Sequence, residues 1–200
     1  MLAALLVSSP LWAQTVSLGL RAGIPVTPPF TVDGRQQVSA PRFTMGPLIE
    51  VHVWRGAGLG ADFLLRHADL AISTAGSQRA EVWQWEAPIT FIYRFRAAAR
   101  PFVRTGVSLN RVFDISGATE CARGRFGERF YCLEGSSLAE LRHRGTFGFV
   151  VGGGLRFKRK KLCLEPEVRL TRWIDHNFGV RDSAVRSNLN QIGLLVGVIF

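Results

Sequence analysis

The chain has 200 residues, of which 47% are apolar and 20% are charged, and its formal net charge at pH 7 is +10. This length suits a single domain, and this composition excludes both an intrinsically disordered chain and a bundle of membrane-spanning helices. The basic residues are scattered over almost every segment, which argues against a nucleic-acid partner and leaves attraction to anionic lipid phosphates as a secondary role for the surplus charge.

The first segment in chain order, residues 1–13, is almost entirely apolar and ends at Leu11-Trp12-Ala13. It resembles the apolar core and cleavage site of a secretory signal, although the usual basic start is missing. We therefore expect a signal peptide at residues 1–13, with its start incomplete, and one domain over residues 14–200; a buried N-terminal stretch is the alternative. No later run reaches the roughly 18 consecutive apolar residues that a transmembrane helix needs.

Eight later segments alternate apolar and polar residues with a period of two, which is typical of strands that have one face of each kind. In chain order they cover residues 16–24, 43–53, 58–66, 84–95, 103–110, 146–157, 162–171 and 191–200. Their lengths are near the roughly 9 to 11 residues that a tilted strand needs to cross a bilayer, whereas ordinary globular strands have about five or six.

The connections between these segments alternate in length. Short turns are expected at residues 55–56, 96–100 and 158–161, and long polar stretches at residues 25–42, 68–80, 111–145 and 174–187. Bacterial outer-membrane barrels show this pattern, with the long loops extracellular. The predicted fold class is therefore all-β, as an eight-stranded antiparallel up-and-down transmembrane β-barrel.

Alternation alone does not say which face meets lipid, so a soluble lipocalin-like ligand-binding barrel is the alternative. Glycines beside charged residues favour an enclosed polar face, because a narrow lumen needs small residues next to long ones. Aromatic residues near the strand ends suggest an interfacial girdle, made of Trp54, Trp85, Tyr93, Phe95, Phe157 and Trp173. Pro47, Pro88 and Pro166 fall inside the expected strands, where we expect bulges because proline lacks the ladder donor.

The export signal, the eight alternating strands and the terminal Phe200 together resemble the small outer-membrane β-barrel superfamily, over nearly the whole mature chain. Residues 165–173 are similar to the penultimate strands of uncharacterised members. The resemblance implies a location in the bacterial outer membrane, among outer-membrane lipid and lipopolysaccharide. It also implies that residues 191–200, ending in Phe200, form the signal read by the barrel-insertion machinery.

The polar faces of the expected strands collect six basic and five acidic residues. These are Arg21, Arg66, Arg94, Arg104, Arg156 and Arg169, with Glu50, Asp62, Glu86, Glu165 and Glu167. Eight strands leave an interior that side chains just fill, so we expect these charges to pair with one another and plug the lumen. A narrow polar conduit is the alternative.

Two cysteines, Cys121 and Cys132, are separated by ten residues in a polar stretch. This spacing allows a disulfide that closes a loop in an oxidising compartment, in which case Cys163 has no cysteine partner. The alternative is that all three thiols are free. We expect residues 111–145 to carry any surface-binding role, with a purely structural role in the envelope as the other hypothesis.

The sequence offers one weak catalytic candidate, His176. Residues 173–179 loosely resemble the His-x-Ser stretch of lipid A 3-O-deacylases, whose His, Ser and acidic residue form a nucleophilic triad. Phe178 stands where the serine should be, and Ser183 and Ser187 have the wrong spacing. We therefore predict a monomer that is not an enzyme and has no cofactor or metal, with a lipid A-modifying hydrolase as the alternative.

Overall fold

A computed structural model describes residues 16–28, 30–32, 43–73, 77–123, 130–134, 144–160, 162–176 and 185–200. All regular secondary structure in these ranges is β-strand. Within them there is no helix of the length and hydropathy needed to cross a membrane. The signal peptide expected at residues 1–13 lies outside the described residues.

One large antiparallel sheet makes up the body of the molecule. Its wall consists of β1 (Val16–Pro25), β3 (Phe43–Trp54), β4 (Ala57–Asp62), β5 (Leu64–Ser73), β6 (Ser77–Arg94), β7 (Pro101–Arg123), β9 (Gly145–Leu155), β10 (Phe157–Arg159), β11 (Leu162–Trp173) and β13 (Asn190–Ile199). A further strand, β8 (Phe130–Glu134), pairs with the end of β7, and β2 (Phe30–Val32) pairs with β12 (Val185–Ser187) in a separate small sheet.

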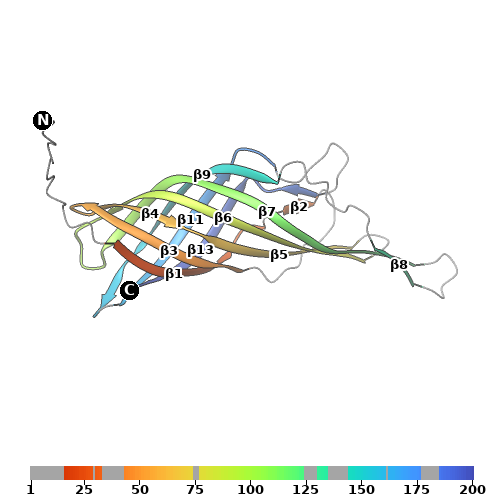
Figure 1. Cartoon of the computed structure of the whole chain (residues 1–200), viewed down its shortest axis with the longest axis horizontal. Helices are drawn as coiled ribbons and strands as arrows, with labels where there is room; N and C mark the ends of the chain where they lie inside the picture. The colour runs from red at the N-terminus through yellow and green to blue at the C-terminus, as the bar shows by residue number, and fades with distance from the viewer. Residues whose placement is uncertain are drawn as a thin grey trace, which may run out of the picture.

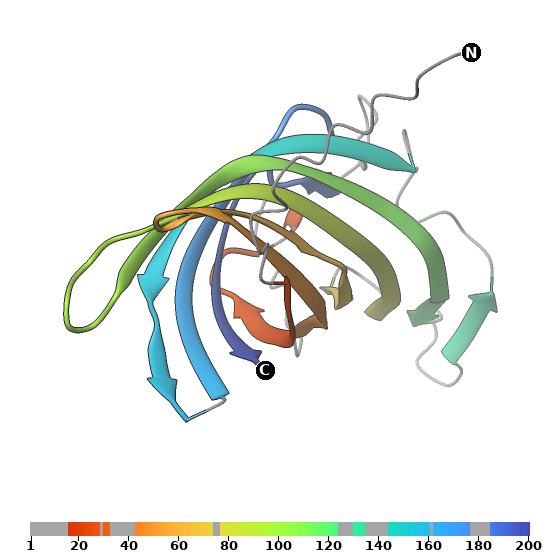
Figure 2. The ribbon, with the colours of Figure 1, turned by 60° about the vertical axis from the view of Figure 1, so that its left-hand side comes forward.

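The sheet closes on itself as an eight-stranded up-and-down barrel. Each wall strand pairs with the next along the chain, and the last, β13, pairs with β1. β4 and β5 form one strand interrupted at Phe63, and β10 continues β9 beyond Arg156. Figure 2 shows β13 curving round to lie beside β1. The predicted fold class and all eight predicted strands are confirmed.

Some strands are longer than the alternation indicates. β5 and β6 stay paired as far as Ser73 and Ser77, and β7 continues to Arg123 with β8 beside it. These paired segments extend from the end of the barrel opposite the C-terminus (Figure 1). Treating residues 68–80 and 111–145 as wholly loop was therefore wrong. Two strands paired in a hairpin satisfy each other's backbone hydrogen bonds whether or not one face is apolar. The alternation of apolar and polar side chains therefore does not show where the pairing ends.

The bulges expected at the three prolines are absent from the described ladders. Pro47, Pro88 and Pro166 are each paired in unbroken register with one neighbouring strand, opposite Leu20, Ser108 and Val196 respectively. On its other side Pro47 still accepts a hydrogen bond of 2.9 Å from the backbone N–H of Phe63. A residue of an antiparallel strand directs its N–H to one neighbour only, so proline removes one bond without needing an extra residue.

Burial along the strands is the reverse of that in a soluble protein. On β1, Leu18 and Leu20 are each 59% exposed, whereas Arg21, the next residue of the same strand, is 1% exposed. The same inversion holds around the ring, since most of the large apolar side chains of the wall strands are exposed and ten charged side chains are buried. A surface of this kind is stable against hydrocarbon and not against water, so the lipocalin-like alternative is wrong.

The aromatic residues near the strand ends do not all share one face. Trp54, Tyr93, Phe95 and Phe157 are exposed on the outside, as a girdle requires. Trp173 is only 4% exposed and belongs to the interior, which corrects its assignment to the girdle. The reason is its position on the same face of β11 as Arg169 and Thr171, since alternate residues of a strand share a face.

Candidate functional site

The eleven charged residues expected on the polar faces come together inside the ring of strands. Ten are buried and Arg66 is half-buried. They come from β1 (Arg21), β3 (Glu50), β4 (Asp62), β5 (Arg66), β6 (Glu86, Arg94), β7 (Arg104), the link between β9 and β10 (Arg156) and β11 (Glu165, Glu167, Arg169). Each of the eleven has at least one ion-pair partner among the others.

Arg104 lies at the centre of these charges. Its guanidinium nitrogens are 3.2 Å from Glu167, 3.5 Å from Glu50, 3.6 Å from Glu165 and 4.0 Å from Asp62. The aromatic ring of Phe102 lies beneath it, 5.2 Å from the guanidinium carbon. One arginine therefore bridges carboxylates supplied by three different strands.

Two further arginines cross-link the same carboxylates. Arg21 contacts Asp62 at 2.6 Å and Glu167 at 3.5 Å, and Arg169 contacts the same two residues at 2.7 Å each. Because these side chains have almost no access to water, removing any one would leave a buried charge without its full set of partners. The central network is thus stable only as a complete set.

The network differs at its two ends. Towards the short turns, Arg94 pairs with Glu50, and Arg156 reaches Glu50 at 3.2 Å and Glu165 at 2.9 Å. Towards the other end, Arg66 and Glu86 form a pair at 2.7 Å. Ser108 also donates to Glu86 at 2.9 Å, and two small cavities beside Arg66 measure only about 10 Å³ each.

Glycine makes room for the central arginines. Gly152 on β9 lies directly opposite Arg104 on one side and Arg169 on the other. A Cβ atom at this position would stand 2.8 Å from Oε1 of Glu167 and 3.1 Å from Cγ of Arg104. Any larger residue would displace the arginine and glutamate side chains that pass over it, which explains a glycine on the charged face.

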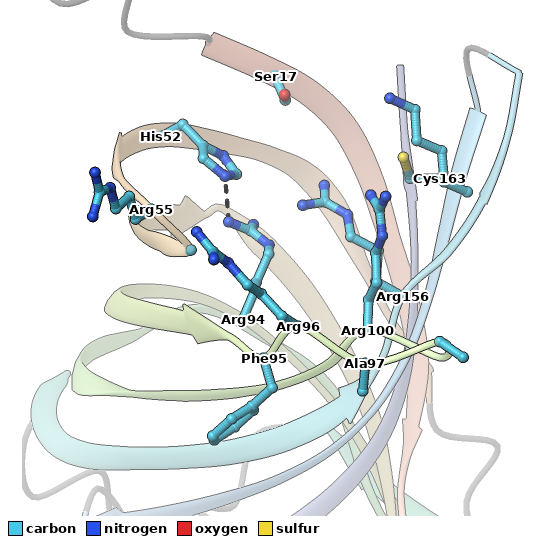
Figure 3. A pocket seen from close by; sticks show the side chains of 13 residues that line it. Ser17, His52, Arg55, Arg94, Phe95, Arg96, Ala97, Arg100, Arg156 and Cys163 are labelled. Atoms are coloured by element: carbon cyan, nitrogen blue, oxygen red, sulfur yellow. Dashed lines mark hydrogen bonds between the residues drawn. The ribbon is translucent and has the colours of Figure 1, made fainter.

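The short-turn end of the barrel has a basic mouth, which we define as the hollow of about 780 Å³ shown in Figure 3. Its charged lining residues are Arg55, Arg94, Arg96, Arg100, Arg156 and Lys158, and none of its lining residues is acidic. Figure 3 shows the arginines of this lining arranged around an open space, with Cys163 across from Arg55 and Arg94. The arrangement suits an anion.

The arginines of the mouth fall into two groups. Arg94 and Arg156 are buried and paired with carboxylates below the mouth, and Arg94 also lies 3.4 Å from Nδ1 of His52. The others that line it, Arg55, Arg96, Arg100 and Lys158, are exposed, and in the described part of the chain none forms an ion pair with a carboxylate.

Sequence analysis did not find this mouth, although a signal was present. Arg55 lies in the first short turn, Arg96 and Arg100 in the second, and Lys158 just before the third. An up-and-down barrel brings every second turn to the same end, so basic residues in all three short turns must converge. Each expected short turn was considered separately, and this concealed the convergence of their basic residues.

Comparison with known proteins adds to this geometry. No protein-family model matches the sequence, and no curated protein matches it. Among solved structures, the outer membrane protein OprG from Pseudomonas aeruginosa is similar, with a TM-score of 0.57, 11% identity and 92% of each chain covered. This chain has the fold of a small outer-membrane β-barrel.

A second structure supports the same fold. Neisserial surface protein A is similar to the chain with a TM-score of 0.51 and 15% identity, over 92% of this chain and 94% of that protein. At these identities the likeness concerns the fold. The outer-membrane location predicted from the sequence agrees with the name of OprG and with the apolar exterior of this barrel.

The cysteines occupy two separate parts of the outer-membrane barrel. In the extension formed by β7 and β8, the backbone of Cys121 lies directly opposite that of Cys132; their side chains lie outside the described residues. Cys163 is a free thiol that lines the basic mouth.

Elements of a hydrolase or of a metal site are not assembled in the described part of the barrel. Nδ1 of His176 lies 2.9 Å from the backbone carbonyl oxygen of Ser187, while Phe178 and Ser183 lie outside the described residues. Among the described residues there is no cluster of three His, Cys, Asp or Glu side chains that could hold a metal ion.

Proposed function

We propose that the protein is a monomeric integral barrel of the bacterial outer membrane, not an enzyme, whose interior charges close the lumen. The observation that carries this proposal is that all eleven interior charged residues are engaged in ion pairs, with Arg104 alone contacting four carboxylates. A conduit would need charged groups facing an open water column, and an eight-stranded barrel has little room for one.

Conductance in planar bilayers tests the closed lumen. We expect the purified, refolded protein to give no stable open-channel steps. The variant Arg104→Ala, which removes the central bridge, should increase the frequency of brief openings. Regular conductance steps in the wild-type protein would contradict the proposal and favour the narrow conduit.

We also propose that residues 191–200, which end in Phe200, form the signal read by the barrel-insertion machinery. The position of Phe200 in the barrel supports this proposal. The N–H of Phe200 donates to the carbonyl of Leu18 at 2.9 Å, and its ring is 66% exposed at the outer face. The ring is thus available to another protein before the barrel meets lipid. Phe200→Ala should slow assembly in cells, measured as the fraction of heat-modifiable barrel on a detergent gel, whereas Ile192→Ala on the same strand should not.

The part of the protein beyond the membrane is proposed to have a structural or surface-binding role, strengthened by a disulfide between Cys121 and Cys132. The opposed backbone positions of these residues on β7 and β8 support that pairing. Intact mass with and without reduction, after alkylation, tests it: one alkylated thiol before reduction and three after are expected. Deletion of residues 111–145 tests the binding role, which would be contradicted if all envelope phenotypes stayed unchanged.

A further inference from the structure

Two hollows meet at the short-turn end of the barrel. The first is the basic mouth of about 780 Å³ inside the ring; the second, of about 800 Å³, lies against the outer face of β3, β4 and β6. Both are lined by Arg55, Arg94, Phe95 and Arg96. The two hollows therefore share a rim, with charge on its inner side and apolar surface on its outer side.

The outer hollow, here called the lipid groove, has an apolar lining. Its lining side chains that are exposed on the outer face are Val53, Trp54, Leu59, Phe91, Tyr93 and Phe95. Ala57 is paired with Trp54 on one neighbouring strand and with Tyr93 on the other. A methyl side chain between two large rings leaves a depression, and the apolar lining of this depression suits an acyl chain.

The rim is held firmly in place. The N–H of Arg94 donates to the carbonyl of Gly56 at 2.8 Å, which ties the β3–β4 turn to β6. Gly56 has φ of +100°, and a Cβ there would stand 2.6 Å from the carbonyl oxygen of Arg94, so only glycine allows this close approach. Arg55 lies with its guanidinium carbon 5.8 Å from the centre of the Trp54 ring.

Charge at the rim determines which ligand fits. Arg55 and Arg96 are exposed and have no ion pair with a carboxylate in the described part of the chain, and the buried Nε of Arg94 has no hydrogen-bond partner. Figure 3 shows Arg55, Arg94 and Arg96 on the same side of the basic mouth. A phosphate group placed there would meet uncompensated guanidinium groups, which bind phosphate well.

We propose that the rim and the lipid groove bind one anionic glycerophospholipid from the surrounding membrane. Its phosphate lies against Arg55 and Arg96 at the mouth, and one acyl chain lies along the groove past Ala57. A zwitterionic lipid brings its own cation to the rim and is bound less well. A free phosphate uses the rim and leaves the groove unused, so the lipid is the ligand that uses both hollows.

Native mass spectrometry of the purified, folded barrel in detergent tests the proposal, with a phosphatidylglycerol and a phosphatidylcholine of the same acyl chains added in equal amounts. We expect the wild-type protein to retain phosphatidylglycerol roughly thirtyfold more than phosphatidylcholine, as two near-surface arginines would give. The double variant Arg55→Gln with Arg96→Gln should lose most of this preference.

A matched control separates a site from a diffuse positive field. The double variant Arg159→Gln with Lys160→Gln removes the same charge at the same end of the barrel, from residues that line neither hollow. It should retain the preference of the wild type. An equal loss in both double variants, or equal retention of the two lipids by the wild type, would overturn the proposal.

A second variant tests the groove with every charge in place. Ala57→Leu fills the depression on the lipid-facing surface and should weaken retention of phosphatidylglycerol several-fold, while a heat-modifiable band confirms that it folds. Retention unchanged in Ala57→Leu would overturn the acyl-chain part of the site. Displacement of the lipid from the wild-type protein by excess glycerol phosphate would identify a free-phosphate site and overturn the lipid proposal.

Discussion

Arginine is the main charged residue of both the interior network and the basic mouth. The arginines of the network are buried or half-buried and paired with carboxylates, whereas most of those at the mouth are exposed. Arg104, in the network, is 2% exposed and surrounded by four carboxylates, whereas Arg100, at the mouth, is exposed and has no carboxylate partner in the described residues. A buried arginine must be paired because its charge has lost water; an exposed one has no such requirement. The interior arginines are therefore held in place by their carboxylate partners, whereas the exposed arginines of the mouth have no such partner in the described residues.

The largest expected effect comes from breaking the network at its centre. Arg104→Met should lower the free energy of unfolding by about 3 to 5 kcal/mol, because four carboxylates lose their shared cation in a site without water. Unfolding in urea, followed by tryptophan fluorescence in lipid vesicles, measures it. The same change at the mouth, Arg100→Met, should alter stability by less than about 0.5 kcal/mol. Equal effects at the two positions would remove the distinction between the two regions.

A somewhat smaller effect is expected from crowding the network. Gly152→Val should destabilise the barrel by about 1 to 3 kcal/mol, because the new side chain meets Glu167 and Arg104. The adjacent Gly153→Val is the control: an added Cβ there meets its nearest atom at 3.5 Å, an ordinary contact. The same unfolding measurement applies to both. If Gly152→Val were as stable as Gly153→Val, the glycine would not be making room for the charges.

Arg94 belongs to both regions and should show an intermediate effect. Its partner Glu50 also contacts Arg104 and Arg156, so Arg94→Met leaves that carboxylate with two cations. We expect a loss of about 1 to 2 kcal/mol, less than for Arg104→Met. A double-mutant cycle with Glu50→Gln should give a coupling energy within about 0.5 to 3 kcal/mol, and zero coupling would place Arg94 with the mouth alone.

The smallest effect concerns the field of the basic mouth, reported by Cys163. In a Cys121→Ser, Cys132→Ser background, an anionic methanethiosulfonate reagent should modify Cys163 several-fold faster than a cationic one of similar size. Added salt should reduce the difference, because the charges at the mouth are exposed. Stopped-flow or mass-resolved labelling measures both rates. Faster reaction with the cationic reagent would contradict an electropositive mouth.

The comparison also separates what sequence analysis found from what it missed. It identified the charged residues of the interior because each falls on the polar side of an alternating strand, as Arg169 does on β11. It did not identify the mouth, because Arg55, Arg96 and Lys158 lie in or beside three turns that are far apart in the chain. Trp173 was assigned to the outer girdle although its position in the strand places it with Arg169 inside.

By itself, the sequence determined that the chain forms eight strands with one oily and one charged face, because a period of two is a local property of the extended backbone. It did not determine which charges meet. That Arg104 lies among carboxylates of β3, β4 and β11 depends on register and on the stagger of a closed sheet, which involve residues distant in the chain. Tertiary structure also decided how far β7 extends, because residues 111–123 mix apolar and polar residues at both sets of alternate positions and so show no clean alternation.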